Sequence, residues 1–130
     1  GGWDVSNVLY MSNMLRSTNF NYPLNLWDTS SVQAMYNLFA NTAAFNQDIS
    51  DWSFVSVTRI DGIMVGKTAN DYNSNYLSNL LIKLDQDLIF ANMTNVNIGF
   101  GSIKYDSTGV TAYNSLISKG FIIQSGGLEV

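Results

Sequence analysis

The chain has 130 residues, a formal net charge of −4 and neither cysteine nor histidine. This length suits one domain with one continuous core. The six lysine and arginine residues are scattered, which argues against a phosphate-binding surface and so against a nucleic-acid partner. Without histidine and cysteine the chain lacks the commonest general base, the thiol nucleophile and the usual zinc ligands. We therefore expect a protein that is not an enzyme and holds no cofactor or metal.

No apolar run approaches the roughly 18 to 20 residues that a membrane span needs, so we expect no membrane insertion by this chain. Gly1 and Gly2 lead directly into a repeat that is already under way. Because solenoid proteins generally cover their terminal units, we expect the natural polypeptide to continue toward its N-terminus.

Three tryptophans, Trp3, Trp27 and Trp52, divide the first half of the chain into units of 24 and 25 residues. A period of this length is typical of a solenoid, in which each unit buries its apolar face against the next. Other residues share the phase and are predicted to form ladders through the stack: Met11, Met35 and Ile60, then Phe20 and Phe45, then Asn21 and Asn46.

Each unit is predicted to contain one short helix and one short strand. Apolar residues of the second unit have the i, i+3, i+6, i+7 spacing of one helix face: Val32, Met35, Leu38 and Phe39. Ser30 and Gln33 fit a capping box before that face. Short strands are expected near Leu24–Trp27 and Ile49–Trp52, and they pair in parallel between units.

Asn21 and Asn46 follow the phenylalanine position and admit two interpretations. They are surface polar residues, or they are inward-turned amides that bond the free backbone of the neighbouring unit. Their repetition at one phase favours the inward interpretation, which predicts that Asn46→Ala destabilises the fold.

The periodicity changes from Asn73 onward. Leucines at helical spacing predict an amphipathic helix that Asn73 or Ser74 caps. Two short strands and a second helix with a glycine end are expected after it: Val96–Ile98, Phe121–Ile123, and Ser107 or Thr108 to Lys119 before Gly120. We interpret residues 67–130 as a cap on the solenoid of residues 1–66, within the same domain, because an exposed strand edge invites pairing with another chain.

The unit resembles the repeat of the BspA-like leucine-rich-repeat surface proteins, which includes the repeat of mycoplasma lipoproteins. Residues 3–8 read WDVSNV and match the first half of that repeat, and residues 45–50 read FNQDIS and match the second half. The C-terminal part is also similar to family members, with Lys104-Tyr105 in a turn and a closing Gly126-Gly127. Residues 53–55 depart from the usual DVS, which fits a stack that ends near residue 66.

The resemblance implies an α/β solenoid: a short right-handed stack of about three helix-plus-short-strand repeats with an α+β C-terminal cap. It also implies display on a cell or virion surface and a part in adhesion or host contact, without catalysis. The right-handed sense of the stack, the surface display and the part in adhesion are expectations from the resemblance alone.

Two kinds of chemistry have weak sequence signals. Carboxylate pairs suitable for glycan hydrolysis occur as Asp48 with Asp51 and as Asp85 with Asp87. Residues 71–75 imitate the start of a calcium loop, but the required glycine and the later glutamate are absent, so helix capping is the stronger interpretation.

We therefore expect a non-enzymatic, extracellular or cell-surface repeat domain that binds a protein or a glycan on a host surface. The first alternative is a virion structural module, such as a phage capsid decoration or fibre protein, whose partners are other virion proteins. The second is a carboxylate-dependent glycan hydrolase. Four tyrosines are candidates for surface contact, with ordinary packing as the alternative: Tyr10, Tyr22, Tyr36 and Tyr72.

Overall fold

The computed structural model of the protein describes residues 3–130. Gly1 and Gly2, on which the expected N-terminal continuation rests, lie outside the described residues. The described chain is a mixed α/β structure with two α-helices and two small parallel sheets of two strands each. Its elements in chain order are η1 (Ala69–Asp71), α1 (Ser74–Asp87), η2 (Phe90–Asn92), β1 (Asn97–Gly99), β2 (Lys104–Tyr105), η3 (Ser107–Gly109), α2 (Val110–Lys119), β3 (Ile122–Gln124) and β4 (Gly127–Leu128).

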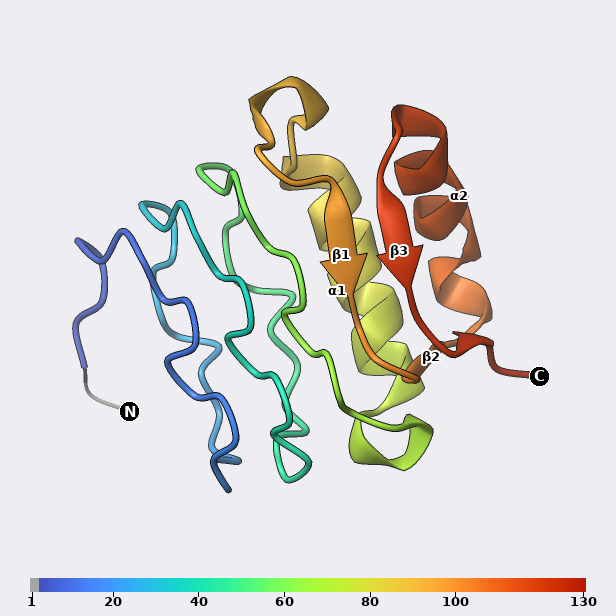
Figure 1. Cartoon of the computed structure of the whole chain (residues 1–130), viewed down its shortest axis with the longest axis horizontal. Helices are drawn as coiled ribbons and strands as arrows, with labels where there is room; N and C mark the ends of the chain where they lie inside the picture. The colour runs from blue at the N-terminus through green and yellow to red at the C-terminus, as the bar shows by residue number, and fades with distance from the viewer. Residues whose placement is uncertain (1–2) are drawn as a thin grey trace.

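The tryptophan-containing units lie side by side at one end of the molecule, and the helices and strands follow at the other end (Figure 1). We name these units repeat 1 (3–26), repeat 2 (27–51) and repeat 3 (52–67). The N-terminus lies at the repeat end and the C-terminus at the helical end (Figure 1).

The helix predicted in each repeat is wrong, because residues 12–17, 36–41 and 61–66 form consecutive turns. Every second backbone N–H of the first two segments donates to a carbonyl of the next repeat. These bonds of 2.8–3.1 Å join Met11 to Ala34, Asn13 to Tyr36, Leu15 to Leu38, Ser17 to Ala40, Met35 to Arg59, Asn37 to Asp61, Phe39 to Ile63 and Asn41 to Val65. We call this bonded row of turns the turn ladder.

A left-handed backbone at fixed positions explains why no helix forms. The φ angles are 63° at Asn13, 57° at Asn37 and 64° at Gly62, which occupy the same place in the three repeats. A right-handed helix needs negative φ at every residue, and asparagine and glycine adopt positive φ more readily than other residues. The apolar spacing of three to four residues therefore comes from successive turns.

The predicted strands and capping box of the repeats are also wrong. Residues 24–27 and 49–52 form loops and turns, and parallel pairing between repeats occurs at isolated bridges between Tyr10, Ala34 and Arg59. The Ser30 backbone N–H and hydroxyl both donate to Asp28 Oδ1, at 3.0 and 2.6 Å. An aspartate two residues earlier thus forms a local turn with the serine, which removes it from a helix cap.

A column of indole rings passes through the repeats. Trp27 lies between Trp3 and Trp52, with ring centroids 6.4 and 6.1 Å away and interplanar angles of 17° and 10°. Trp52 is fully buried, whereas Trp3 at the end of the column is 73% exposed. The three tryptophans therefore occupy equivalent places in successive repeats.

A second aromatic column stands beside the first. Phe45 lies between Phe20 and Tyr72, with ring centroids 6.4 and 6.3 Å away. Tyr72 comes after the last repeat, so the ladder is one ring longer than the sequence period indicates. The third apolar position of the period, Met11, Met35 and Ile60, is buried throughout.

The C-terminal part extends the stack. The Thr94 N–H donates to the Thr58 carbonyl and the Met64 N–H to the Gly99 carbonyl, both at 2.9 Å, so the β1 segment bonds to repeat 3. β1 then pairs in parallel with β3, and α1 packs against α2. Figure 1 shows both helices on the same side of these strands.

The predicted C-terminal elements are confirmed within a few residues. The Asn73 side chain caps α1 by accepting hydrogen bonds from the Asn75 and Tyr76 N–H groups. α2 ends at Gly120, whose φ is 108°, and β1 and β3 each begin one residue after the predicted strand. Strong periodicity and clear end signals made these elements predictable.

Lys67 closes repeat 3 from inside the core. Its side chain is buried, and its ammonium donates to the carbonyls of Thr42 and Phe45 at 2.5 and 2.8 Å. Burial lowers the pKa of Lys67 to about 8, although the charge of Asp71 opposes the shift. This cation therefore fastens the end of repeat 3 to repeat 2.

Candidate binding surface

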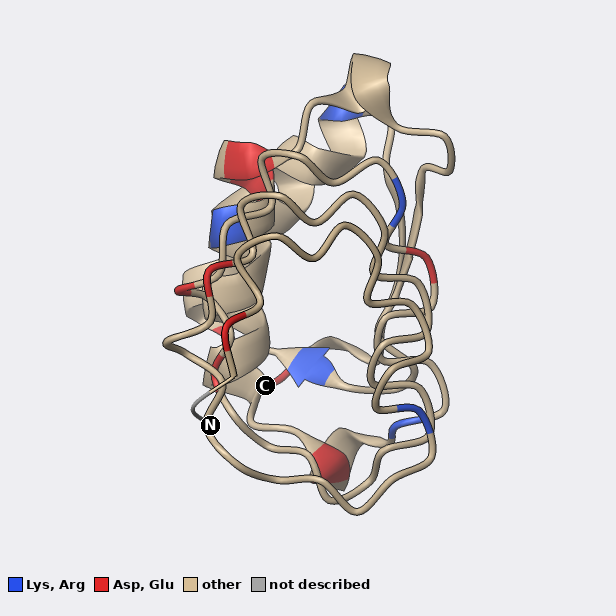
Figure 2. Ribbon diagram, turned by 90° about the vertical axis from the view of Figure 1, so that its left-hand side faces the viewer, with Lys and Arg blue, Asp and Glu red and all other residues tan. Residues whose placement is uncertain are grey.

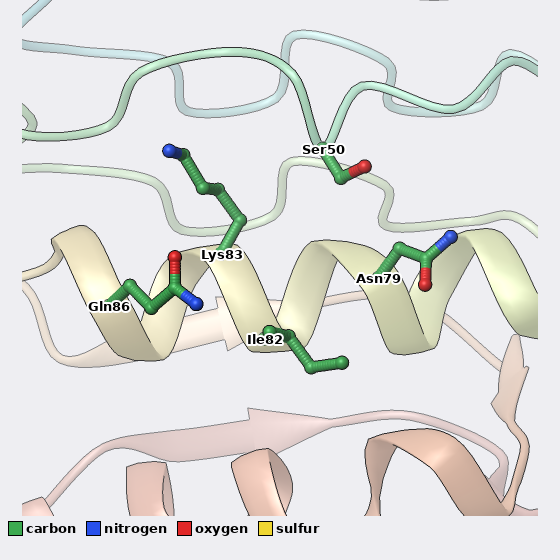
Figure 3. Close-up of a pocket in the computed structure, with 5 residues that line it drawn as sticks. All are labelled: Ser50, Asn79, Ile82, Lys83 and Gln86. Carbon is green, nitrogen blue, oxygen red and sulfur yellow. The ribbon is translucent and has the colours of Figure 1, made fainter.

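A groove of about 340 Å³ lies between α1 and the loop of repeat 2 (Figure 3). It is lined by Ser50, Asn79, Ile82, Lys83 and Gln86. Four of these residues belong to α1 at helical spacing, on the face opposite its buried leucines. The amphipathic pattern that buries one side of α1 thus sets a polar row along the other side.

The groove offers hydrogen-bonding groups around an aliphatic centre. Lys83 lies 3.6 Å from the carboxylate of Asp87, which also accepts the Phe54 N–H at 2.9 Å, so the lysine charge is partly balanced. Ile82 is 37% exposed, and Gln86 is exposed. Amide, hydroxyl and ammonium groups beside an exposed aliphatic side chain suit a ligand rich in hydroxyls or peptide groups.

The aspartates of the hydrolase alternative have structural contacts. Asp48 accepts the Ser50 N–H at 2.9 Å and an Asn79 amide N–H at 3.1 Å, while Asp51 is exposed. Asp85 accepts from the Lys119 ammonium at 2.7 Å. Three of the four candidate carboxylates, Asp87 among them, thus hold loops or helices in place.

The tyrosines proposed for contact lie in different environments. Tyr10 and Tyr22 are 68% and 69% exposed. The Arg59 guanidinium lies 3.9 Å from the ring centroid of Tyr36 and is held by a carboxylate two residues later. Tyr72 is buried and donates its hydroxyl to the Gln47 carbonyl at 2.6 Å, so packing is its role.

The asparagine ladder bonds backbone groups along the surface. Asn21 Oδ1 accepts the Asn46 N–H and Asn46 Oδ1 accepts the Asn73 N–H, each at 2.8 Å. The predicted bonding to the next unit therefore occurs, but the inward orientation is wrong because both asparagines are exposed. These loops lie at the edge of the stack, where an amide reaches its neighbour without entering the core.

Acidic residues gather on the side of the molecule that carries α1, while basic residues are spread over several sides (Figure 2). Asp4 and Asp28 occupy equivalent positions of two repeats, one residue after Trp3 and Trp27. Hydrogen bonds from Ser6 and Ser30 lower the pKa of Asp4 and Asp28, respectively, so both remain ionised at neutral pH. The side of the molecule that carries α1 is therefore negatively charged at neutral pH.

A second hollow, of about 360 Å³, lies at the open side of repeat 1. It is lined by Trp3, Leu15, Phe20, Tyr22, Leu24 and Trp27. This hollow is apolar, in contrast to the polar groove on α1.

Residues 3–130 hold no group of three or more acidic, histidine or cysteine side chains able to bind a metal ion. None of the helices in this part of the chain is long and apolar enough to cross a membrane. Asp71 of the calcium-like segment instead accepts the Thr68 N–H and hydroxyl, at 2.8 and 3.0 Å.

None of the groove residues of α1 is predicted from the sequence to be a site residue. Their only sequence signal is the polar face of the predicted helix, since Asn79, Lys83 and Gln86 recur at intervals of four and three. Their meeting with Ser50 depends on how the helix packs on repeat 2, which spacing alone does not reveal.

The repeats, the bonded turns and the α1 groove define a mixed α/β repeat protein. The chain belongs to the family described as "Mycoplasma protein of unknown function, DUF285", whose sequence model matches residues 1–101. The match covers all three repeats, α1 and β1. No curated protein and no solved structure matches this chain.

Proposed function

We propose that this chain is a non-enzymatic, surface-displayed binding domain of the BspA-like type, built as an α/β solenoid. The groove on α1 contacts a protein or a glycan on a host surface, and the stacked repeats hold that groove at a fixed place. The DUF285 match is consistent with the resemblance to mycoplasma-type repeats, although that family has no stated function.

The observation that carries the proposal is the chemistry of the α1 groove. The exposed Gln86 amide forms no hydrogen bond within residues 3–130, and the Ile82 side chain is 37% exposed, so both are available to a ligand. The nearby carboxylate of Asp48 is already bonded to Ser50 and Asn79. An available row of neutral groups beside an occupied carboxylate favours recognition over acid–base chemistry.

The test compares groove and control variants for binding to host cells, matrix proteins and arrayed glycans. Ile82→Ser and Gln86→Ala are expected to abolish binding while the thermal unfolding midpoint stays unchanged. Asn114→Ala, an exposed amide on α2, is the matched control and should bind normally. Equal loss in all three variants, or binding by none of the forms including the wild type, would contradict the proposal.

Light scattering on the purified chain separates this proposal from the virion alternative. An isolated adhesion domain should be monomeric at micromolar concentration. A defined oligomer, or co-purification with particles, would instead favour a capsid decoration or fibre module.

A further inference from the structure

One dipeptide of repeat 3 combines a reactive sequence with a fixed place in the turn ladder. Asp61-Gly62 is the only position of the chain where an aspartate or an asparagine precedes a glycine. Because glycine has no side chain, nothing on it hinders attack of its backbone nitrogen on the preceding carboxyl carbon. The equivalent pairs of repeats 1 and 2 are Ser12-Asn13 and Tyr36-Asn37, so repeat 3 alone carries this chemistry.

The structure requires glycine at position 62. The φ angle of Gly62 is 64°, in the left-handed region, and a side chain there would overlap the amide oxygen of Asn37. β1 also comes close, since a Cβ on Gly99 would lie 3.1 Å from the Gly62 Cα. A larger residue after Asp61 would therefore disturb the contacts of repeat 3 with repeat 2 and with β1.

The backbone nitrogen of Gly62 is available as a nucleophile. The equivalent N–H groups of Asn13 and Asn37 donate to the carbonyls of Tyr36 and Asp61, at 3.0 and 3.1 Å. The Gly62 N–H donates to no acceptor within residues 3–130. Gly62 also lines a hollow of about 270 Å³ beside β1, so water reaches this part of the backbone.

Arg59 occupies both oxygens of the Asp61 carboxylate. Its Nε and one terminal nitrogen donate to Oδ1 and Oδ2 at 2.8 and 3.2 Å, and its guanidinium lies 3.9 Å from the ring centroid of Tyr36. Asp28 and Asp48 instead accept the N–H two residues later, at 3.0 and 2.9 Å. The Asp61 carboxylate is thus bonded to a residue that precedes it, and as the anion rather than as the carboxylic acid that reacts.

We propose that Asp61-Gly62 is a site of spontaneous isoaspartate formation that Arg59 suppresses in the folded protein. In the reaction the Gly62 nitrogen loses its proton and bonds to the Asp61 carboxyl carbon, and the carboxyl OH leaves with that proton as water. The product is a five-membered succinimide. Water then opens the ring: attack at the side-chain carbonyl restores aspartate, and attack at the main-chain carbonyl gives isoaspartate. No oxidant or reductant is needed.

The modification acts on the contacts that join repeat 3 to its neighbours. Isoaspartate adds one atom to the backbone between residues 61 and 62 and converts the Asp61 main-chain carbonyl, which accepts the Asn37 N–H, into a free carboxylate. The added atom also moves Gly62 relative to Gly99, whose carbonyl accepts the Met64 N–H at 2.9 Å. Isoaspartate at position 61 therefore loosens the junction between the repeats and the C-terminal part, whatever ligand the α1 groove binds.

The test follows isoaspartate at residue 61 while the full chain is stored in mildly acidic buffer at body temperature. Mass spectrometry with electron-transfer fragmentation quantifies isoaspartate in the peptide that contains this residue. Arg59→Met removes both donors to Asp61 and keeps a long apolar side chain beside Tyr36. Arg16→Met, at an exposed arginine of repeat 1, changes the net charge equally and is the matched control. Each protein is also incubated unfolded in urea.

Folded Arg59→Met should form isoaspartate about fivefold faster than the folded wild-type protein, the factor expected for loss of an exposed bidentate ion pair. Folded Arg16→Met should match the wild type, and all three proteins should share one faster rate in urea. In protein that carries isoaspartate at position 61, hydrogen exchange of the Asn37 and Met64 N–H groups should be faster.

Equal rates in folded wild-type protein and folded Arg59→Met would overturn the proposal. So would a rate in Arg59→Met that equals its unfolded fraction multiplied by the rate in urea. Global unfolding, and not loss of the ion pair, would then expose the dipeptide.

Discussion

The repeats and the C-terminal helices satisfy their backbone groups in different ways. In the turn ladder, N–H groups of one repeat bond carbonyls of the next, so a repeat depends on its neighbour for its own hydrogen bonds. In α1 and α2 the bonds lie within each helix, and contact with the rest of the molecule comes from buried leucines. The repeat region is therefore expected to fold only as a stack, while the helical region provides the surface that ends it.

The largest effect is expected from removal of the helical region. Deleting residues 70–130 uncovers Trp52, Phe54 and Met64, which are fully buried, and removes Tyr72 from its column. The remaining repeats should aggregate or lose their structure, as judged by light scattering and circular dichroism. Removing Val130 alone, which is fully exposed, is the control. A soluble, monomeric and folded truncation would show that the repeats are independent of the helices.

Tryptophan substitutions compare the interior and the end of the indole column. Trp52→Ala removes a buried ring that stacks on Trp27 and bonds Leu24, and it should cost about 3–5 kcal/mol of unfolding free energy. Trp3→Ala removes a largely exposed ring and should cost less than about 1 kcal/mol. Urea unfolding measures both, and equal losses would refute the interior position of Trp52.

The buried lysine gives the junction between the regions a pH dependence. Between pH 8 and 10.5 the unfolded chain keeps a proton that folded Lys67 has released, so unfolding takes up a proton and stability rises with pH. Lys67→Met should remove that rise, seen by urea unfolding at pH 7.5 and 9.5. It should also cost about 1–3 kcal/mol at pH 7.5, because the carbonyls of Thr42 and Phe45 lose their donor.

Lys104→Met, at an exposed lysine, is the control for this pH dependence. It should show the same rise between the two pH values as the wild-type protein. If the unfolding free energy of Lys67→Met still rises with pH as in the wild-type protein, a group other than Lys67 causes the rise.

A smaller effect is expected at the surface ladder that links the two regions. Asn46→Ala removes the acceptor for the N–H of Asn73, the residue that caps α1. The loss should be about 1 kcal/mol, because the group is exposed and water replaces part of the bond. Asn7→Ala, at an exposed asparagine outside the ladder, should leave the melting temperature unchanged. An unchanged melting temperature in Asn46→Ala would mean that the ladder contributes nothing to stability.

The two regions also differ in how far their sequence predicts them. α1 is predictable because Asn73 and the leucine spacing are local signals of helix start and helix face. The phase of Trp3, Trp27 and Trp52 likewise predicts which rings meet. The path of the chain between those rings is not predictable from apolar spacing, because turns with left-handed residues at Asn13 and Asn37 produce the same spacing as a helix. Asparagine and glycine at that fixed place are the signal that favours turns.

The candidate site is less predictable than the fold. Ser50 and Gln86 lie 36 positions apart in the sequence and line one groove only because α1 packs beside repeat 2. Tyr72 illustrates the same limit, since its place in the phenylalanine column follows from the path of the chain after the last repeat. Contacts made by packing across repeats need the three-dimensional arrangement.

The repeat arrangement and the proposed binding role both require that successive repeats lie ring over ring. Nuclear Overhauser contacts between the three indoles, assigned by single Trp→Phe variants, test this directly. The arrangement predicts cross-peaks between Trp3 and Trp27 and between Trp27 and Trp52, and none between Trp3 and Trp52, which stand on opposite sides of Trp27. Cross-peaks between Trp3 and Trp52, or none to Trp27 from either side, would contradict the stacked arrangement and the binding role built on it.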